Sequence, residues 1–360
     1  MVEVYFATNR NYEGKSEFGT GFHADGPHNV RLGWAEVEPR NADDYVVNRS
    51  KITVADEDIS QDPDLGKGRE KTKLGSREVF ERMRKRMIEE GRDIICLIHG
   101  FAANFETALA RVAEISVDYG TPERPLLGFV FSWPANGSMI PFLDYYSDRH
   151  DARASELAIA RTFLRLCKFL EKLKETERCD RSIHLVVHSM GNWALRHALD
   201  DIIEEFGGRP PRLFDNIFLM AADADNDAFE KEDKFKRLPD ICKAVHVYFS
   251  KDDRALMTSD ITKFNPDRLG ATGPAVRGKL PRKVNLIDCQ HVDVPDRKSQ
   301  EPGKNWDLSV HQYYRLRREV IVDVQQVLAG VAPRDIVGRR YMEDDRSFQI
   351  IPFSKRFNRR

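Results

Sequence analysis

The sequence predicts an α/β protein built on a doubly wound, mostly parallel sheet. Between residues 76 and 328, apolar runs of strand length alternate with longer runs that fit helices, which is the order of elements in that fold class. Two of the apolar runs, 93–101 and 183–188, are nearly uninterrupted, as is typical of parallel strands covered on both faces. The chain of 360 residues is long enough to bury a large core.

The N-terminal part is expected to add antiparallel strands to this sheet. Residues 2–7 combine β-branched and aromatic side chains and end at turn-forming residues 8–11, which indicates a strand followed by a turn. A further strand or two is expected within residues 29–38. Residues 41–75 are polar and rich in turn-forming residues, so an irregular loop is expected there.

From residue 76 onward, helices and strands are expected to alternate. Ser76 is a favoured N-cap and Gly91 a favoured terminator, so the first helix should cover residues 76–90. The strands expected after it are 93–101, 126–133, 183–188, 217–221, 244–249 and 283–288, and the helices are 104–119, 152–174, 190–206, a short one near Phe229, and 310–328.

These elements are expected to form one domain over residues 1–330. Residues 221–244 leave room for only a short helix, so no large cap domain is expected between the flanking strands. Residues 331–360 carry arginines and lysines among apolar residues. They are expected to form a C-terminal arm, strapped to the surface or in contact with another copy of the chain in a homo-oligomer.

Composition excludes several classes of partner. The chain is 41% hydrophobic and 32% charged with a formal net charge of −1, so no global basic field indicates nucleic acid, and small neutral or mixed substrates fit better. Five cysteines without CxxC spacing suggest reduced thiols. The N-terminus does not resemble a secretory signal, and 18 consecutive apolar residues occur nowhere. We expect a cytoplasmic protein without a membrane span.

The strand expected at 183–188 leads through Ser189 into an amphipathic helix, a pattern that indicates a nucleophile elbow. Gly191 supplies the small residue that such a turn needs, whereas Val187 stands where the motif usually has its first glycine. The first amide groups of the helix, including that of Met190, would stabilise negative charge beside Ser189. The alternative is that Ser189 only caps the helix.

A second oxyanion donor is expected after the strand at 93–101. In the sequence His99-Gly100-Phe101-Ala102, Gly100 lets the backbone turn so that the N–H of Phe101 or Ala102 can reach a substrate oxygen. An ordinary strand-ending turn is the alternative.

The acid is expected just past a strand's carboxyl end, where ligands bind in open α/β sheets. Asp253 is favoured over Asp252, because a turn separates it from the strand at 244–249. Asp225 and Asp227, which follow the preceding strand, are the alternatives.

For the base, the order serine, acid, histidine allows His291 and His311. His311 is favoured because a long loop can fold back over the sheet edge while the helix behind it fixes the imidazole. In this arrangement His311 would deprotonate Ser189, and Asp253 would hold the tautomer of His311 and stabilise its charged form.

Five motifs of the sequence occur in a fixed order along the chain. They are residues 4–10, residues 98–101, residues 131–134 with residues 151–155, residues 188–192 and residues 311–314. Together they resemble a bacterial family of uncharacterised α/β-hydrolases. The resemblance covers roughly residues 1–328 and implies the α/β-hydrolase fold, a triad of Ser189, Asp253 and His311, and no known substrate.

The expected reaction is hydrolysis of a carboxylic ester of a small to medium acyl substrate, with thioester and amide cleavage not separated by the sequence. A non-catalytic scaffold or binding protein on the same fold is the alternative. No cofactor is expected, and the histidines and cysteines show no metal-binding spacing. Loops at 134–146, 264–281 and 290–306 should cover the site, and its substrate-binding residues are expected to be Gly100, His188, Trp133, Phe142 and Tyr145.

Overall fold

The computed structural model describes residues 1–41, 44–55, 75–137, 143–253, 255–256, 267–292 and 310–353. The strands of its main sheet are β1 Val2–Thr8, β4 Arg31–Asn41, β5 Asp44–Val54, β6 Asp93–Ile98, β7 Leu126–Ser132, β8 Ile183–His188, β9 Phe214–Met220, β10 Cys242–Phe249, β11 Val284–Asp288, β12 Arg339–Met342 and β13 Ser347–Ile350. A separate hairpin pairs β2 Arg10–Gly14 with β3 Glu17–Phe22.

The α-helices are α1 Gly75–Glu89, α2 Phe105–Tyr119, α3 Leu143–Ala154, α4 Glu156–Glu171, α5 Gly191–Glu205, α7 Leu269–Thr272, α8 Tyr313–Leu316 and α9 Arg318–Leu328. The described residues also form short 3₁₀ segments, namely η3 Glu175–Glu177, η4 Leu238–Ile241 and η5 Arg277–Lys279. Within the described residues, no helix has the length and apolar character needed to cross a bilayer.

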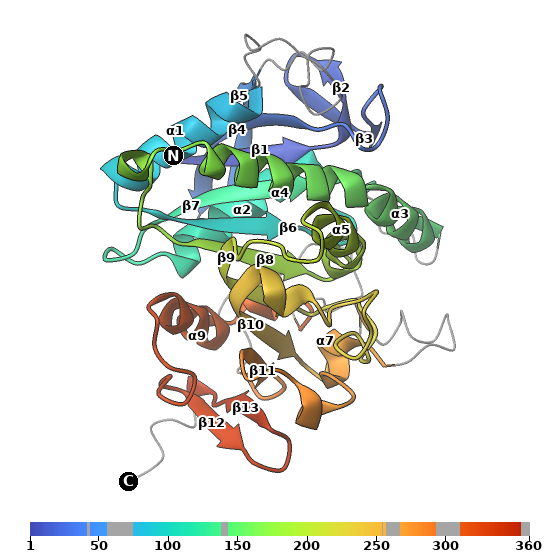
Figure 1. The fold of residues 1–360 in the computed structure, drawn as a ribbon, viewed down its shortest axis with the longest axis vertical. Coiled ribbons are helices and arrows are strands. Elements are labelled where there is room, and N and C mark those ends of the chain that lie inside the picture. The colour runs from blue at the N-terminus through green and yellow to red at the C-terminus, as the bar shows by residue number, and fades with distance from the viewer. Residues whose placement is uncertain are drawn as a thin grey trace.

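The main sheet has eleven strands in the order β12-β13-β11-β10-β9-β8-β6-β7-β1-β4-β5. The strands from β1 through β7, β6, β8, β9 and β10 to β11 pair in parallel, and β4 and β5 add antiparallel pairs at one edge. This arrangement confirms the predicted fold class (Figure 1).

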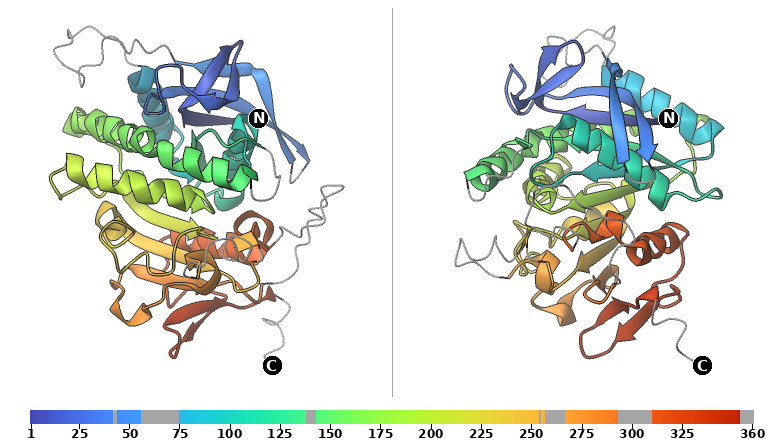
Figure 2. Two further views of the ribbon diagram at one scale, coloured as in Figure 1. Left: turned by 90° about the vertical axis from the view of Figure 1, so that its right-hand side faces the viewer. Right: turned by 180° about the vertical axis from the view of Figure 1, so that it is seen from behind.

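Helices cover both faces of the sheet, because its central strands are apolar on both sides. In β6, Ile94 and Ile98 pack in the core that includes α1, α4 and α5, while Ile95 and Leu97 pack in the core that includes α2 and α9. Figure 2 shows the hairpin β2–β3 at one end of the molecule and the strands β12 and β13 at the other.

The N-terminal region holds more regular structure than the sequence indicated. Residues 44–54, expected within an irregular loop, form the edge strand β5, and the hairpin β2–β3 was not expected at all. The outer strand has few buried side chains and therefore lacks the apolar run of a central strand. The rest of the expected loop, residues 56–74, lies outside the described part of the chain.

Two helices expected to be continuous are interrupted. The one predicted over residues 152–174 is split at Ser155, whose hydroxyl donates to the carbonyl of Asp151 while Asn9 Nδ2 donates to it. The helix predicted over residues 310–328 divides at Arg317, and the preceding turn is fixed by the hydroxyl of Tyr313. That hydroxyl donates to the carbonyl of Tyr248 and accepts from a backbone N–H. These tertiary contacts override local helix propensity. The segment near Phe229 forms turns, and not the short helix expected there.

The C-terminal segment joins the sheet, whereas a surface arm was expected. Strand β13 pairs in parallel with β11, and β12 pairs with β13. The buried guanidinium of Arg339 donates to both oxygens of Asp323 on α9, at 2.7 and 2.6 Å. Tyr248 of β10 donates to the same carboxylate at 2.6 Å. The pair therefore ties the segment to the core.

Replacing Arg339 by alanine is expected to lower the free energy of unfolding by about 3–5 kcal/mol, because it leaves the buried carboxylate of Asp323 without its counterion. Chemical denaturation would measure the loss. Arg340→Ala is the matched control, since Arg340 lies on the same strand, is exposed and, in the described part of the chain, has only a side-chain hydrogen bond to Gln349. Its effect should stay within about 0.5 kcal/mol. Equal effects of the two substitutions would contradict the anchoring role.

Candidate active site

Ser189 occupies a strained turn between β8 and α5. Its φ is 50°, in the left-handed region that non-glycine residues rarely adopt. The N–H of Ser189 donates to the carbonyl of Met220, and its carbonyl accepts from Asp223 and Asn192. A side chain at Gly191 would approach the carbonyl oxygens of His99 and Ile98 to 2.6 and 2.7 Å, so only glycine fits that position. The local geometry is that of a nucleophile elbow.

Asn192 supports the turn from inside the helix. Its side-chain amide donates to the carbonyls of Val187 and Ser189 at 3.1 and 3.0 Å. Val187, which replaces the usual first glycine, is fully buried in the core on the α5 side. The elbow therefore accommodates valine at this position without losing its hydrogen bonds.

The loop after β6 passes directly against the elbow. A Cβ atom on Gly100 would lie 2.8 Å from Cβ of Ser189 and 3.0 Å from Nδ1 of His188. Within the described residues, no hydrogen bond uses the N–H of Phe101 or Met190. The N–H of Ala102, by contrast, donates to Asp148 Oδ2 at 3.1 Å. Of the three expected oxyanion donors, the N–H of Ala102 is therefore already bonded to a side chain of the protein and is not available to a substrate oxygen.

His311 and Asp253 meet at the same edge of the sheet. Nδ1 of His311 lies 2.8 Å from Oδ2 of Asp253, and both side chains are buried. Asp253 lies in the turn after β10, and its other carboxylate oxygen accepts from the N–H of Leu256. Since Nδ1 donates to the carboxylate, the neutral ring of His311 carries its free lone pair on Nε2.

The pKa values of the two buried histidines beside the elbow are shifted in opposite directions. Burial lowers the pKa of His311, but the charge and hydrogen bond of Asp253, helped by the charge of Asp223, outweigh it and raise that pKa above its usual 6.5. Burial lowers the pKa of His188 far below the usual value. Neutral His188 donates from Nε2 to the carbonyl of His311 at 3.2 Å, and the two rings lie 4.8 Å apart. His188 thus holds the backbone of His311 in place.

The alternative acids and base lie in other environments. Asp252 and His291 are exposed. Asp225 forms ion pairs with Arg268 and Lys234, each at 2.8 Å. Asp227 pairs with Lys231 at 2.7 Å and also with Lys234. The structure therefore brings Asp253, and none of these aspartates, to His311.

A comparison with known protein families identifies the family of this chain. A protein-family model described as "Alpha/beta hydrolase of unknown function (DUF900)" matches residues 76–328, which is well over half of the chain. The chain belongs to this family. The matched residues run from α1 to α9 and so contain the elbow, Asp253 and His311, while the strands β1 to β5 and β12 to β13 lie outside the match.

The α/β-hydrolase is also similar to an uncharacterized protein, alr1448, of Nostoc sp. (strain PCC 7120). The two sequences are 26% identical over 179 residues, which is 42% of this chain and 44% of the cyanobacterial protein. The chain thus aligns with less than half of that relative's length.

The structure places the expected substrate-binding residues of the α/β-hydrolase in different environments. Gly100 and His188 contact the elbow, as described above. Trp133 is fully buried, donates from Nε1 to the carbonyl of His99 at 2.9 Å and stacks on the His99 ring. It supports the loop after β6 and has no surface for a substrate. Phe142 lies outside the described residues, as do parts of all three loops expected to cover the site.

Tyr145 on α3 is connected to the elbow by a hydrogen bond to Asp223, a residue that the sequence did not single out. Its hydroxyl donates to Asp223 Oδ2 at 2.6 Å, and its ring lies 6.0 Å from that of Phe101. Asp223 is buried, and its N–H bonds the carbonyl of Ser189. The position of Asp223 two residues before Asp225 gave only a weak signal, because an aspartate after a strand is ordinarily a helix cap.

Proposed function

We propose that this α/β-hydrolase cleaves a carboxylic ester through an acyl-enzyme on Ser189. The observation that carries the proposal is the buried pair of His311 and Asp253, 2.8 Å apart at the sheet edge that also holds the elbow. A serine hydroxyl is a weak nucleophile, and an oriented imidazole activates it by accepting its proton. Asp253 holds the tautomer of His311 and stabilises the imidazolium that forms.

The reaction follows from these roles. The oxygen of Ser189 attacks the ester carbonyl as its proton passes to Nε2 of His311, and the resulting oxyanion accepts hydrogen bonds from the N–H groups of Met190 and Phe101. Collapse of this intermediate breaks the ester bond, and the leaving alcohol takes the proton from His311. Water then attacks the acyl-enzyme in the same manner, giving the acid and free Ser189.

The surroundings favour a small to medium acyl group. Phe101 and Tyr145 are aromatic, partly accessible and in contact near the elbow, so they offer an apolar surface to an acyl chain. Thioesters and amides would follow the same steps.

Fluorophosphonate labelling tests the proposal directly. The folded protein should be labelled on Ser189 and should hydrolyse p-nitrophenyl esters in a chain-length series. A folded protein that reacts with neither reagent, beside a reactive control hydrolase, would instead indicate a non-catalytic binding protein on this fold.

The rate should depend on pH through His311. The base acts when neutral, so kcat/KM is expected to rise with pH through a midpoint above 6.5, because the pKa of His311 is raised by Asp253. His188 titrates far lower and should not add a limb in this range. The pH profile of p-nitrophenyl butyrate hydrolysis measures the midpoint, and a value at or below that of free histidine would contradict this assignment.

A further inference from the structure

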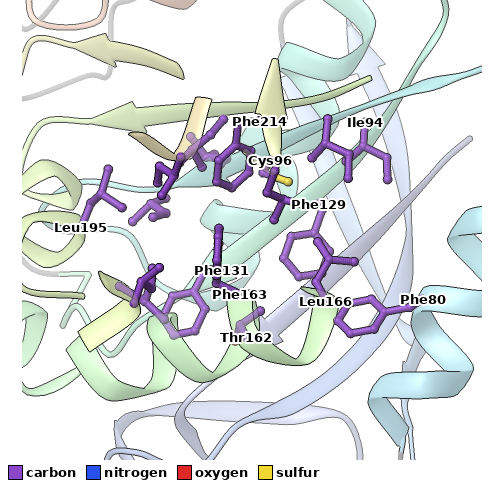
Figure 3. Close-up of a pocket in the computed structure, with 18 of the residues that line it drawn as sticks. Phe80, Ile94, Cys96, Phe129, Phe131, Thr162, Phe163, Leu166, Leu195 and Phe214 are labelled. Atoms are coloured by element: carbon purple, nitrogen blue, oxygen red, sulfur yellow. The ribbon is translucent and has the colours of Figure 1, made fainter. Parts of the chain in front are cut away.

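An apolar chamber lies between the sheet and the helices α1, α4 and α5. Its volume is about 70 Å³, and Thr162 is the one polar residue among those lining it (Figure 3). The hydroxyl of Thr162 donates to the carbonyl of Ala158 at 2.8 Å. The walls therefore offer a water molecule no free partner, and a chamber of this kind stays dry or takes up apolar ligands.

Cys96 provides a second sign of the chamber. It is the one residue of β6 that is not fully buried, although β6 is a central strand covered on both faces. Cys96 lines the chamber, and Figure 3 shows its side chain among the aromatic residues there. Its accessible surface thus faces the chamber.

A larger pocket of about 400 Å³ adjoins the chamber and shares part of its wall. This vestibule lies at the amino ends of β6 and β8, whereas Ser189 follows the carboxyl end of β8. The two spaces are therefore neighbours, and the vestibule opens to the surface at the sheet edge opposite Ser189. They share the lining residues Phe80, Met83, Ile94, Leu166, Ile183 and Leu213.

The mouth of the vestibule carries excess positive charge. Its acids are Glu171 and Asp215, and Lys243 already pairs with Asp215 at 2.7 Å. Three exposed arginines there have no carboxylate partner within the described residues, although Arg181 donates to the carbonyl of Gly91. These arginines are Arg178, Arg181 and Arg212.

We propose that the chamber and vestibule bind a straight-chain carboxylate, with its hydrocarbon tail inside and its head group at Arg178 and Arg212. The chamber is smaller than the roughly 150 Å³ of an apolar cavity that admits benzene, so it suits the narrow end of an unbranched chain better than a ring. The vestibule gives room for the rest of the chain. Guanidinium groups bind carboxylates through paired, charge-assisted hydrogen bonds. This site is separate from Ser189 and does not depend on ester hydrolysis.

Calorimetric titration of the full chain with decanoate, dodecanoate and tetradecanoate tests the site. One molecule should bind per chain, with Kd falling about fourfold for each added methylene. Dodecanol, which lacks the charge, should bind at least about tenfold more weakly than dodecanoate. Binding that does not saturate, or a Kd that does not depend on the chain length of the carboxylate, would overturn the proposal.

Variants separate the tail from the head group. Cys96→Leu fills part of the chamber and should raise the Kd for tetradecanoate about tenfold or more. This factor corresponds to two methylenes of the ligand that can no longer be buried. The double variant Arg178→Glu/Arg212→Glu should weaken the binding of dodecanoate and leave the binding of dodecanol unchanged. Arg209→Glu is the matched control, because Arg209 is exposed nearby but does not line the vestibule. Equal weakening by the control and the double variant would overturn the head-group site.

Ser189→Ala distinguishes this site from the one proposed for hydrolysis. The variant should bind dodecanoate with the wild-type Kd even where it has lost all ester hydrolysis. Loss of dodecanoate binding after fluorophosphonate labels Ser189 would place the ligand at the elbow and overturn the proposal. Unfolding midpoints of each variant should be measured, so that a folding defect is not read as lost affinity.

Discussion

Ser189→Ala is expected to lower kcat for ester hydrolysis by a factor on the order of 10⁶, because serine, histidine and aspartate act as a unit and the serine forms the bond to the substrate. Steady-state kinetics with p-nitrophenyl butyrate would measure the change. The elbow should survive the substitution, since the contacts that hold Ser189 described above use its backbone N–H and carbonyl.

Ser116→Ala is the matched control for this substitution. Ser116 is also buried but lies on α2, where its hydroxyl donates to the carbonyl of Ala113. Its kcat should stay within about twofold of wild type, as for a change away from the reacting atoms. If Ser189→Ala kept the activity of the control, the acyl-enzyme mechanism would be excluded.

Asp253→Asn is expected to reduce kcat by about 10⁴-fold, because an amide in this position favours the wrong tautomer of His311 and cannot stabilise its charged form. The acidic limb of the pH profile should also move to lower pH. The charge and hydrogen bond of Asp253 are what raise the pKa of His311 against burial, and both effects weaken in the variant.

Asp252 offers a closely matched control for the acid. Asp252 is the adjacent residue and has the same side chain, but it is exposed. Its N–H donates to the hydroxyl of Ser250, whereas the hydrogen bond to His311 is made by Asp253. Asp252→Asn should leave kcat within about twofold of wild type and the pH midpoint unchanged. Similar losses in the two variants would show that Asp253 acts through general stability, which denaturation of both variants would reveal.

The sequence was informative wherever the relevant signal is local. The alternation of apolar and helical runs predicted the central sheet because those strands are buried on both faces. It missed β5 and β12, since these edge strands carry few buried residues and read as polar. It also missed β13, which is mostly buried but only four residues long. The helix break at Ser155 depends on Asn9, which is distant in sequence, so local propensity could not predict it.

The same distinction applies to the candidate site. The positions of Ser189, Asp253 and His311 after strands and in chain order predict them from the sequence, and the structure brings the last two together. The expectation for Ala102 failed because its N–H is taken by Asp148, a residue 46 positions away. Trp133 likewise turned out to support His99. Hydrogen bonds of this range leave no pattern in a single sequence.

The separation of the elbow from the acid and base has a consequence for damaged or incomplete chains. The elbow is built within β8 and α5, but Asp253 follows β10 and His311 precedes α8. A fragment that ends after β9, whether from premature termination or from a protease, would keep Ser189 and lack its proposed acid and base. Under the proposed mechanism, partial products of synthesis and degradation would thus carry an unreactive serine until the last third of the chain has docked.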